Sequence, residues 1–293
     1  MAMANGFNLS EWNASKDQYM GVSVWWTVSK AHLPKDAVDE QALMCGLDSE
    51  LFVKPSAKKA FSRSVLAVSR EHGSRFARTI VDRPDSMVVG VVSEAVEQSE
   101  ERLSYRQTAT ARFNKDSKEV VVEGDGGEGL VESYEHFRGH YTDGDIRTFI
   151  RRVVMTCAGV ALRPSGGIYF IPRQYVDTMV SLDAFLKQLG VGRIYFMRVP
   201  VGESERQIAW ESAELEVGSR VEEILARVDK IGKVVMYAEK QGERLDEVKA
   251  LMDCYIELTE SEAQAENIRD KLKDAESVVT KKIDELQLQA AKR

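Results

Sequence analysis

Apolar residues alternate with polar ones over residues 76–124, and they recur at helical spacing on either side of that stretch. Four runs in it are rich in β-branched and aromatic residues and are separated by short polar connections: FARTIVD, SMVVGVVSEAV, RLSYRQTATARF and KEVVVEG. A period of two with turn residues between the runs predicts strands. Because sequential strands with short connections usually pair with their neighbours, we predict an antiparallel meander.

The residues before the meander predict one strand and two helices. GVSVWWTVS, residues 21–29, has the β-branched and aromatic composition of a strand. Pro34 precedes a short helical pattern, KDAVDEQALMCGL. Pro55 suits the first turn of a second and longer helix, because proline lacks the N–H that would be unpaired there.

Residues 143–201 predict a helix, a β-hairpin, a second helix and a strand. In the first helix Ile146, Phe149 and Ile150 share one face. The hairpin is VALRPSGGIYFIP, in which two short apolar arms flank a Pro-Ser-Gly-Gly turn. An amphipathic helix that ends at Gly190 and the strand RIYFMRVPV complete the unit.

After Gly202 the apolar residues are spaced alternately by four and three, with charged residues between them. This spacing is the signature of a coiled coil and predicts helix. Two topologies fit it: one long helix that dimerises or trimerises, or a helical hairpin with breaks near Gly242 and Thr259. Thr259 and Glu262 have the spacing of a capping box. We therefore favour a hairpin or bundle that also mediates self-association.

The predicted fold class is α+β: an antiparallel meander plus an α-ββ-α-β unit, followed by a long coiled-coil-like or hairpin helical C-terminal segment. The run EGDGGEGL (123–130) is glycine-rich and is a candidate boundary. We predict an N-terminal α+β region with antiparallel strands over residues 1–125. An α-ββ-α-β region over residues 130–201 can pack on it as one domain, and a helical segment covers residues 203–293.

Composition and charge place the protein in the cytoplasm and leave its partners open. No run of about 18 apolar residues exists, so we expect no membrane contact. Three cysteines lie far apart, which favours a reduced, cytoplasmic protein. Residues 1–201 hold 25 Lys and Arg against 25 Asp and Glu, whereas residues 202–293 hold 15 against 22. The net charge of −7 therefore belongs to the tail, and the remainder can still present a basic face.

The sequence carries no recognisable enzyme signature. It contains neither a GxxxxGK[ST] phosphate loop nor a GxGxxG motif between a strand and a helix. His136 and His140 are four residues apart in HFRGH and could share a helical face, but spacing fixes no third ligand. We therefore assign no catalytic residue, no metal and no cofactor.

Clusters of Lys and Arg residues are the clearest indication of function in the sequence. A helix followed by a glycine-containing hairpin is similar to the recognition helix and wing of a winged-helix domain, although only one of the two further helices needed precedes it. The alternative is a solvated face, or ion pairing with the acidic tail. The candidate nucleic-acid-binding residues are Lys54, Lys58, Lys59, Arg63, Arg70, Arg147, Arg151, Arg152, Arg163 and Arg173.

Aromatic residues on the predicted strands offer a second kind of nucleic-acid contact, because bases stack on aromatic rings. Aromatic residues in strands belong more often to the core. The candidates are Trp25, Trp26, Tyr105, Tyr169 and Phe170.

The segment ALRPSGGIYFIPRQY resembles a hypothetical protein family of bacteria and their phages that has no established activity. The resemblance covers about 60 residues around the hairpin, implies a phage or mobile-element setting, and transfers no functional residue.

These observations predict a non-enzymatic protein that binds DNA or RNA and forms homo-oligomers through its helical tail. The alternative is a structural or adaptor protein whose acidic tail, residues 203–293, docks a protein partner.

Overall fold

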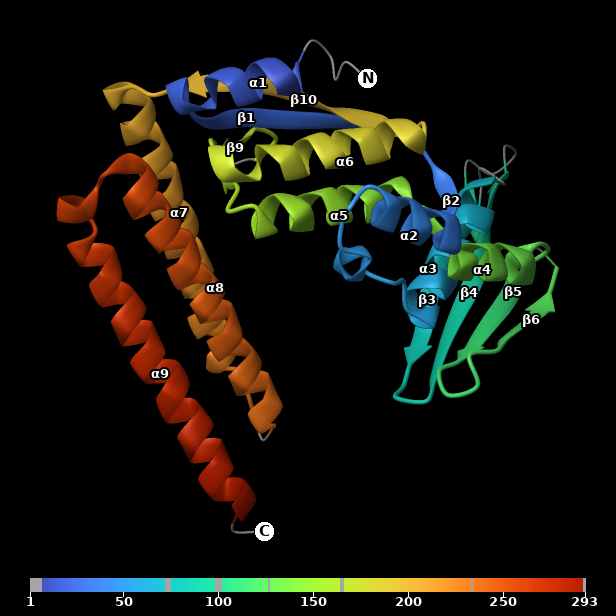
Figure 1. Cartoon of the computed structure of the whole chain (residues 1–293). Helices are drawn as coiled ribbons and strands as arrows, with labels where there is room; N and C mark the ends of the chain where they lie inside the picture. The colour runs from blue at the N-terminus through green and yellow to red at the C-terminus, as the bar shows by residue number, and fades with distance from the viewer. Residues whose placement is uncertain are drawn as a thin grey trace. The chain divides into compact units, whose positions relative to one another are not determined.

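The computed structural model is shown in Figure 1 and describes residues 7–71, 75–97, 102–125, 127–163, 166–232 and 234–291. Packing divides the chain into two compact units, each described by itself below. The first unit consists of Met1–Val28, Cys45–Leu47 and Ile150–Arg293, and the second consists of Ser29–Met44 and Asp48–Phe149. The units are discontinuous in sequence, whereas the predicted regions were consecutive.

A four-stranded antiparallel sheet forms the centre of the second unit. Its strands follow one another in the order β3-β4-β5-β6, so the predicted meander is confirmed. The strands are β3 (Arg75–Asp82), β4 (Ser86–Glu97), β5 (Arg102–Asn114) and β6 (Val120–Gly124). Helices α3 (Ala57–Glu71) and α4 (Leu130–Gly139) lie against one face of this sheet (Figure 1).

The core of the second unit lies between that face and the two helices. Phe61 of α3 stacks on Phe113 of β5 with ring centroids 5.2 Å apart, and both side chains are fully buried. Tyr134 of α4 is also buried, and its hydroxyl donates a hydrogen bond of 2.8 Å to the carbonyl oxygen of Lys118. Each buried aromatic side chain contributes about 1.5–3 kcal/mol of hydrophobic stabilisation. The packing therefore fixes which face of the sheet is covered.

A short two-stranded ribbon connects this core to the start of the next helix. Strand β2 (His32–Pro34) pairs antiparallel with β7 (His140–Thr142), which follows α4 directly. Helix α2 (Lys35–Met44) follows β2, and α5 (Asp143–Thr156) follows β7. The ribbon thereby brings residues near position 32 beside the end of α4, about a hundred residues later in the chain.

The first unit contains the predicted α-ββ-α-β arrangement from Ile150 onward, because the division of the chain falls within its first helix, α5. Its antiparallel sheet has the order β10-β1-β9-β8, so that a strand from the start of the chain pairs with strands from residues 169–200. The strands are β1 (Tyr19–Val28), β8 (Val160–Ala161), β9 (Tyr169–Pro172) and β10 (Gly192–Pro200). The helices beside it are α1 (Leu9–Ser15) and α6 (Val176–Gln188). Helix α6 ends at Gln188, close to the predicted end, and Gly190 just beyond it has a left-handed φ of +68°.

The helical tail is a bundle of three helices, α7 (Glu203–Val228), α8 (Val235–Thr259) and α9 (Glu266–Ala291). Figure 1 shows α8 and α9 side by side, joined by a turn. The predicted break near Thr259 is correct, because Glu260 adopts a left-handed φ of +56° there. The break predicted near Gly242 is wrong. The earlier turn lies between α7 and α8, and Gly242 sits within α8, where an added Cβ would lie 3.9 Å from Val279 and Ile283 of α9.

Among the residues that the structure describes, no helix combines the length and the apolar character needed to cross a membrane.

Candidate functional site

A buried carboxylate in the second unit gathers two of the predicted basic residues. Asp145 is 2% exposed and accepts hydrogen bonds of 2.7 Å from both terminal nitrogens of Arg63. The Nζ of Lys59 lies 3.3 Å from the same carboxylate. The backbone N–H and the hydroxyl of Thr142 donate to it at 2.9 and 2.8 Å. Asp145 therefore closes the first turn of α5 in the manner of a capping box and joins that helix to α3.

The environment keeps Asp145 ionised. Burial alone would raise its pKa, but the hydrogen bonds from Arg63 and Thr142 outweigh that effect and lower the pKa to about 2. Two cations thus share one anion, and much of the positive charge predicted for this part of α3 is balanced inside the unit.

Most of the other predicted basic residues also have partners. Lys58 lies 2.7 Å from Asp82, Lys54 lies 3.9 Å from Glu50, and Arg147 pairs with Asp143 one turn earlier on α5. In the first unit, Arg173 lies 3.6 Å from Asp17, and the Nε of Arg163 donates to the carbonyl oxygen of Gly166. Arg151 and Arg152 are exposed, while the side chain of Arg70 lies outside the described residues.

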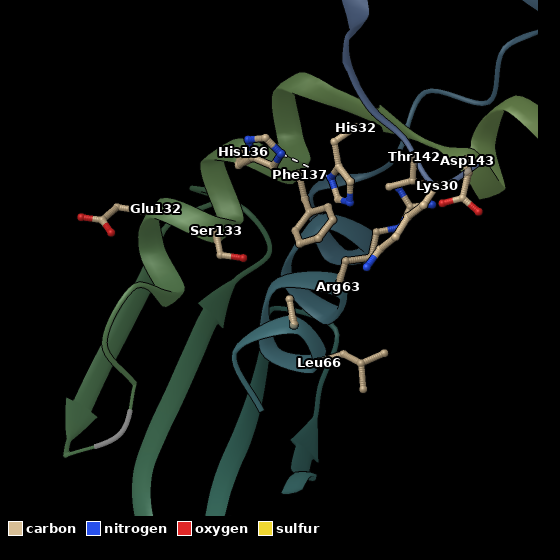
Figure 2. A pocket seen from close by; sticks show the side chains of 11 residues that line it. Lys30, His32, Arg63, Leu66, Glu132, Ser133, His136, Phe137, Thr142 and Asp143 are labelled. Carbon is tan, nitrogen blue, oxygen red and sulfur yellow. Dashed lines mark hydrogen bonds between the residues drawn. The ribbon is translucent and has the colours of Figure 1, made fainter. Parts of the chain in front are cut away.

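An open pocket of about 840 Å³ adjoins this ion-pair network (Figure 2). Residues of α3, of α4 and of the β2–β7 ribbon surround it. Its charged residues balance, with Lys30 and Arg63 against Glu132 and Asp143. A pocket of this size and openness can admit a small ligand, but its charge selects neither anions nor cations.

Three histidines meet at the edge of this pocket. The Nδ1 of His32 lies 3.3 Å from the Nε2 of His136, as Figure 2 shows by a dashed line. The ring of His140 stacks on that of His136 with centroids 4.0 Å apart. The Nδ1–H of His140 donates to the carbonyl oxygen of His136 at 2.8 Å. Burial, His140 and His32 each lower the pKa of His136. In the part of the chain that the structure describes, no group of three or more His, Cys, Asp and Glu side chains is arranged to hold a metal.

The second face of the β3–β6 sheet carries large apolar side chains in the open. Cross-strand pairing places Phe76 opposite Val92 and Val92 opposite Gln107, and it places Arg112 opposite Val121. The exposed side chains include Tyr105 (63%), Val121 (54%), Ile80 (53%) and Phe76 (42%). An outward sheet face is ordinarily polar, so this concentration of exposed apolar surface suggests a binding face. We call it the open sheet face.

A depression of about 230 Å³ lies on the open sheet face, lined by Phe76, Arg78, Val92 and Tyr105. Two aromatic rings and a guanidinium group thus border one hollow. Arg78 and Arg112 form no ion pair with any described residue. Glu94 pairs with Tyr105 across the strands, and Glu123 pairs with Thr110, so the formal charge of the face is balanced.

Sequence reasoning identified one residue of this depression and missed the others. Tyr105 is exposed, whereas Tyr169 and Phe170 are buried in the first unit. Trp25 and Trp26 are half-buried and stack on neighbouring tyrosines. Tyr105 and Gln107 are two residues apart on β5 and therefore lie on the same face of the sheet. The polar Gln107 indicates that this face is the outward one, and the spacing could have distinguished Tyr105 from the core aromatics.

Two of the described cysteines, Cys157 and Cys254, have thiols that burial makes less reactive. Cys157 is buried, and burial raises the pKa of its thiol to about 11. Burial also raises the pKa of the Cys254 thiol. Since the thiolate is the reactive form, both behave as core or boundary residues.

The model of one protein family, a family of unknown function (DUF6744), matches residues 19–292. Neither the curated proteins nor the solved structures contain a match to the chain.

Proposed function

The chain belongs to DUF6744, a family of unknown function, and from its own residues we propose that it binds single-stranded nucleic acid on the open sheet face. The observation that carries this proposal is the depression bordered by Phe76, Tyr105 and Arg78. Every base has a π-face, so two exposed rings beside a guanidinium group suit a stacked nucleotide without requiring a particular sequence.

The form of the surface favours a single strand over a duplex. Four-stranded sheets with exposed aromatic rings bind unstacked bases, whereas the bases of a duplex are already stacked on one another. Gln107 lies on the same face, next to Tyr105 along β5. Its amide nitrogen donates a hydrogen bond of 2.7 Å to the hydroxyl of Thr110, and its amide oxygen can accept a hydrogen bond from a base edge. Stacking contributes about 1–3 kcal/mol per base. Two stacked bases therefore contribute about 2–6 kcal/mol, which corresponds to a weak affinity, and the face adds no net charge to it.

The basic residues of α3 suit this role less well. Lys58, Lys59 and Arg63 each lie within ion-pair distance of a carboxylate, and Asp145 is buried. A phosphate would have to displace those carboxylates. Reversing the charges of these three residues would also break the ion pairs that join α3 to the first turn of α5, so loss of binding in such a variant would not identify the site.

The test is fluorescence anisotropy of labelled single-stranded RNA, single-stranded DNA and duplex DNA with the full chain. We expect saturable binding of the single strands, and we expect Tyr105→Ala and Phe76→Ala each to weaken it by about 1–3 kcal/mol. Tyr237→Ala is the matched control, because Tyr237 is 54% exposed but lies on α8 of the helical bundle. Unchanged affinity in both sheet variants, with the fold intact, would refute the proposal.

A second candidate function rests on a different observation, in the helical bundle. Ile208 and Leu215 of α7 are 52% and 69% exposed and are seven residues apart, so they lie on the same side of the helix. We propose that this side mediates self-association. Light scattering of an Ile208→Glu, Leu215→Glu double variant should give a smaller mass than that of the parent chain. A monomeric parent would remove this candidate and leave the nucleic-acid proposal untouched.

A further inference from the structure

Two histidines that are far apart in the sequence face each other at the pocket of the second unit. His32 belongs to β2 and His136 to α4, and the pairing of β2 with β7 brings them together. Their nearest ring nitrogens are 3.3 Å apart. Figure 2 shows the two rings directed toward one another, with the pocket beside them.

That separation matches the spacing of two ligands on one metal ion. Imidazole nitrogens bind zinc at about 2.0–2.1 Å, so two of them on a tetrahedral ion are about 3.3–3.4 Å apart. The same separation also permits a weak N–H···N hydrogen bond between neutral rings. The two arrangements differ in whether a cation is required, and that difference can be measured.

Neighbouring aromatic groups support both rings. The ring of Phe137 lies 5.3 Å from that of His32, and the ring of His140 stacks on His136. The ring of His140 stacks on that of His136 and does not face it edge to edge. The Nδ1–H of His140 donates to the carbonyl oxygen of His136, so only its Nε2 could bind an ion. The two histidines whose ring nitrogens approach each other are therefore His32 and His136, and not the i,i+4 pair of α4.

We propose that His32 and His136 form a binding site for a divalent transition-metal ion. Imidazole ligands suit Zn²⁺, Ni²⁺ and Cu²⁺, and Cu²⁺ binds most tightly to a given nitrogen site. Both histidines border an open pocket, so water completes the coordination shell. Glu132 also lines the pocket, but Figure 2 shows its carboxylate directed away from the two rings. With two protein ligands, the site binds more weakly than the structural zinc sites that use four.

The experiment is titration of the metal-free full chain with Cu²⁺ and, separately, with Zn²⁺, followed by calorimetry and by electron paramagnetic resonance of the copper form. We expect one saturable site whose copper spectrum shows two coordinated nitrogens. His32→Asn and His136→Asn should each raise the dissociation constant at least tenfold. Circular dichroism should show that both variants keep the parental secondary structure.

The chain offers matched controls, because it has only four histidines. His140→Asn preserves the facing pair and should change the dissociation constant less than threefold. His72→Asn should leave it unchanged. Binding that survives both His32→Asn and His136→Asn would overturn the proposal, as would a copper spectrum without two nitrogen ligands. Failure to bind either metal at all would show that the two rings form only a hydrogen bond.

Discussion

Two groups of cationic side chains in the second unit differ in what surrounds them. On α3, Lys59 and Arg63 converge on the buried carboxylate of Asp145. On the open sheet face, Arg78 forms no ion pair with a described residue and borders a hollow with Phe76 and Tyr105. The group that is denser in sequence is the more fully neutralised. Cationic density along a chain therefore indicates where charges occur and not which of them remain available to a ligand.

The first prediction concerns the ion pairs that Lys59 and Arg63 form with Asp145. Asp145→Asn removes the anion that Arg63 and Lys59 share. Because the side chains of these two cations are 19% and 48% exposed, the cost should be about 1.5–3 kcal/mol, the usual contribution of a hydrogen bond to a charged group. Thermal or denaturant unfolding should show this loss of stability. Asp143→Asn is the control on the same turn of α5, because its pair with Arg147 is partly exposed. Its cost should stay below about 1 kcal/mol. Equal effects of the two substitutions would contradict the structural role of Asp145.

The second prediction concerns acid. The pKa of Asp145 is about 2 in the folded protein against an ordinary value of 3.8. Its ionisation therefore stabilises the fold fully above about pH 4, and that contribution is lost as the pH falls toward 2. The lost stability should be about 2 kcal/mol. The parent should lose this increment between pH 4 and pH 2, and Asp145→Asn should not. Parallel pH curves would exclude Asp145 as the source.

The third prediction tests the cations of the open sheet face through the salt dependence of nucleic-acid affinity. For single strands, the logarithm of the affinity falls with the logarithm of the salt concentration, with a slope of about −0.7 per phosphate contact. Arg78 and Arg112 together therefore give a slope near −1.4, and Arg78→Gln or Arg112→Gln should each reduce it by about 0.7. Anisotropy titrations at several salt concentrations measure the slope. A value near −2.8, expected for the four basic candidates of α3, would point back to that helix.

The smallest expected effect concerns Lys58. Its pair with Asp82 is about half exposed, and exposed pairs contribute about 0–1 kcal/mol. Lys58→Gln should therefore leave both stability and nucleic-acid affinity nearly unchanged. A clear loss of affinity in the absence of unfolding would assign the binding site to α3.

Local patterns predicted much of the fold, because they depend on neighbouring residues. The meander follows from alternation within each strand, and the tail from its three-four spacing. The break near Gly242 was wrong for a tertiary reason. A glycine within a helix costs only about 1 kcal/mol, and the packing of α8 against α7 and α9 compensates for that cost. Val279 and Ile283 of α9 lie at an ordinary contact distance from the place where a Cβ would be.

The candidate sites were largely unpredictable because they join residues that are far apart in the sequence. Arg63 and Asp145 are 82 residues apart, and His32 and His136 are 104 residues apart. Periodicity carries no information about such pairs. The outward direction of Phe76 and Tyr105 depended on which face α3 and α4 would cover, and that is decided by packing between segments.

The interrupted first unit has a consequence for synthesis of the chain. Strand β1 ends at Val28, but its partner β9 begins only at Tyr169, about 140 residues later. At roughly 5–20 residues per second, a ribosome needs about 7–28 s to deliver that partner. The second unit is complete by Phe149 and can fold during this interval. Strand β1, with Trp25 and Trp26, therefore lacks its partners β9 and β10 until those later residues emerge.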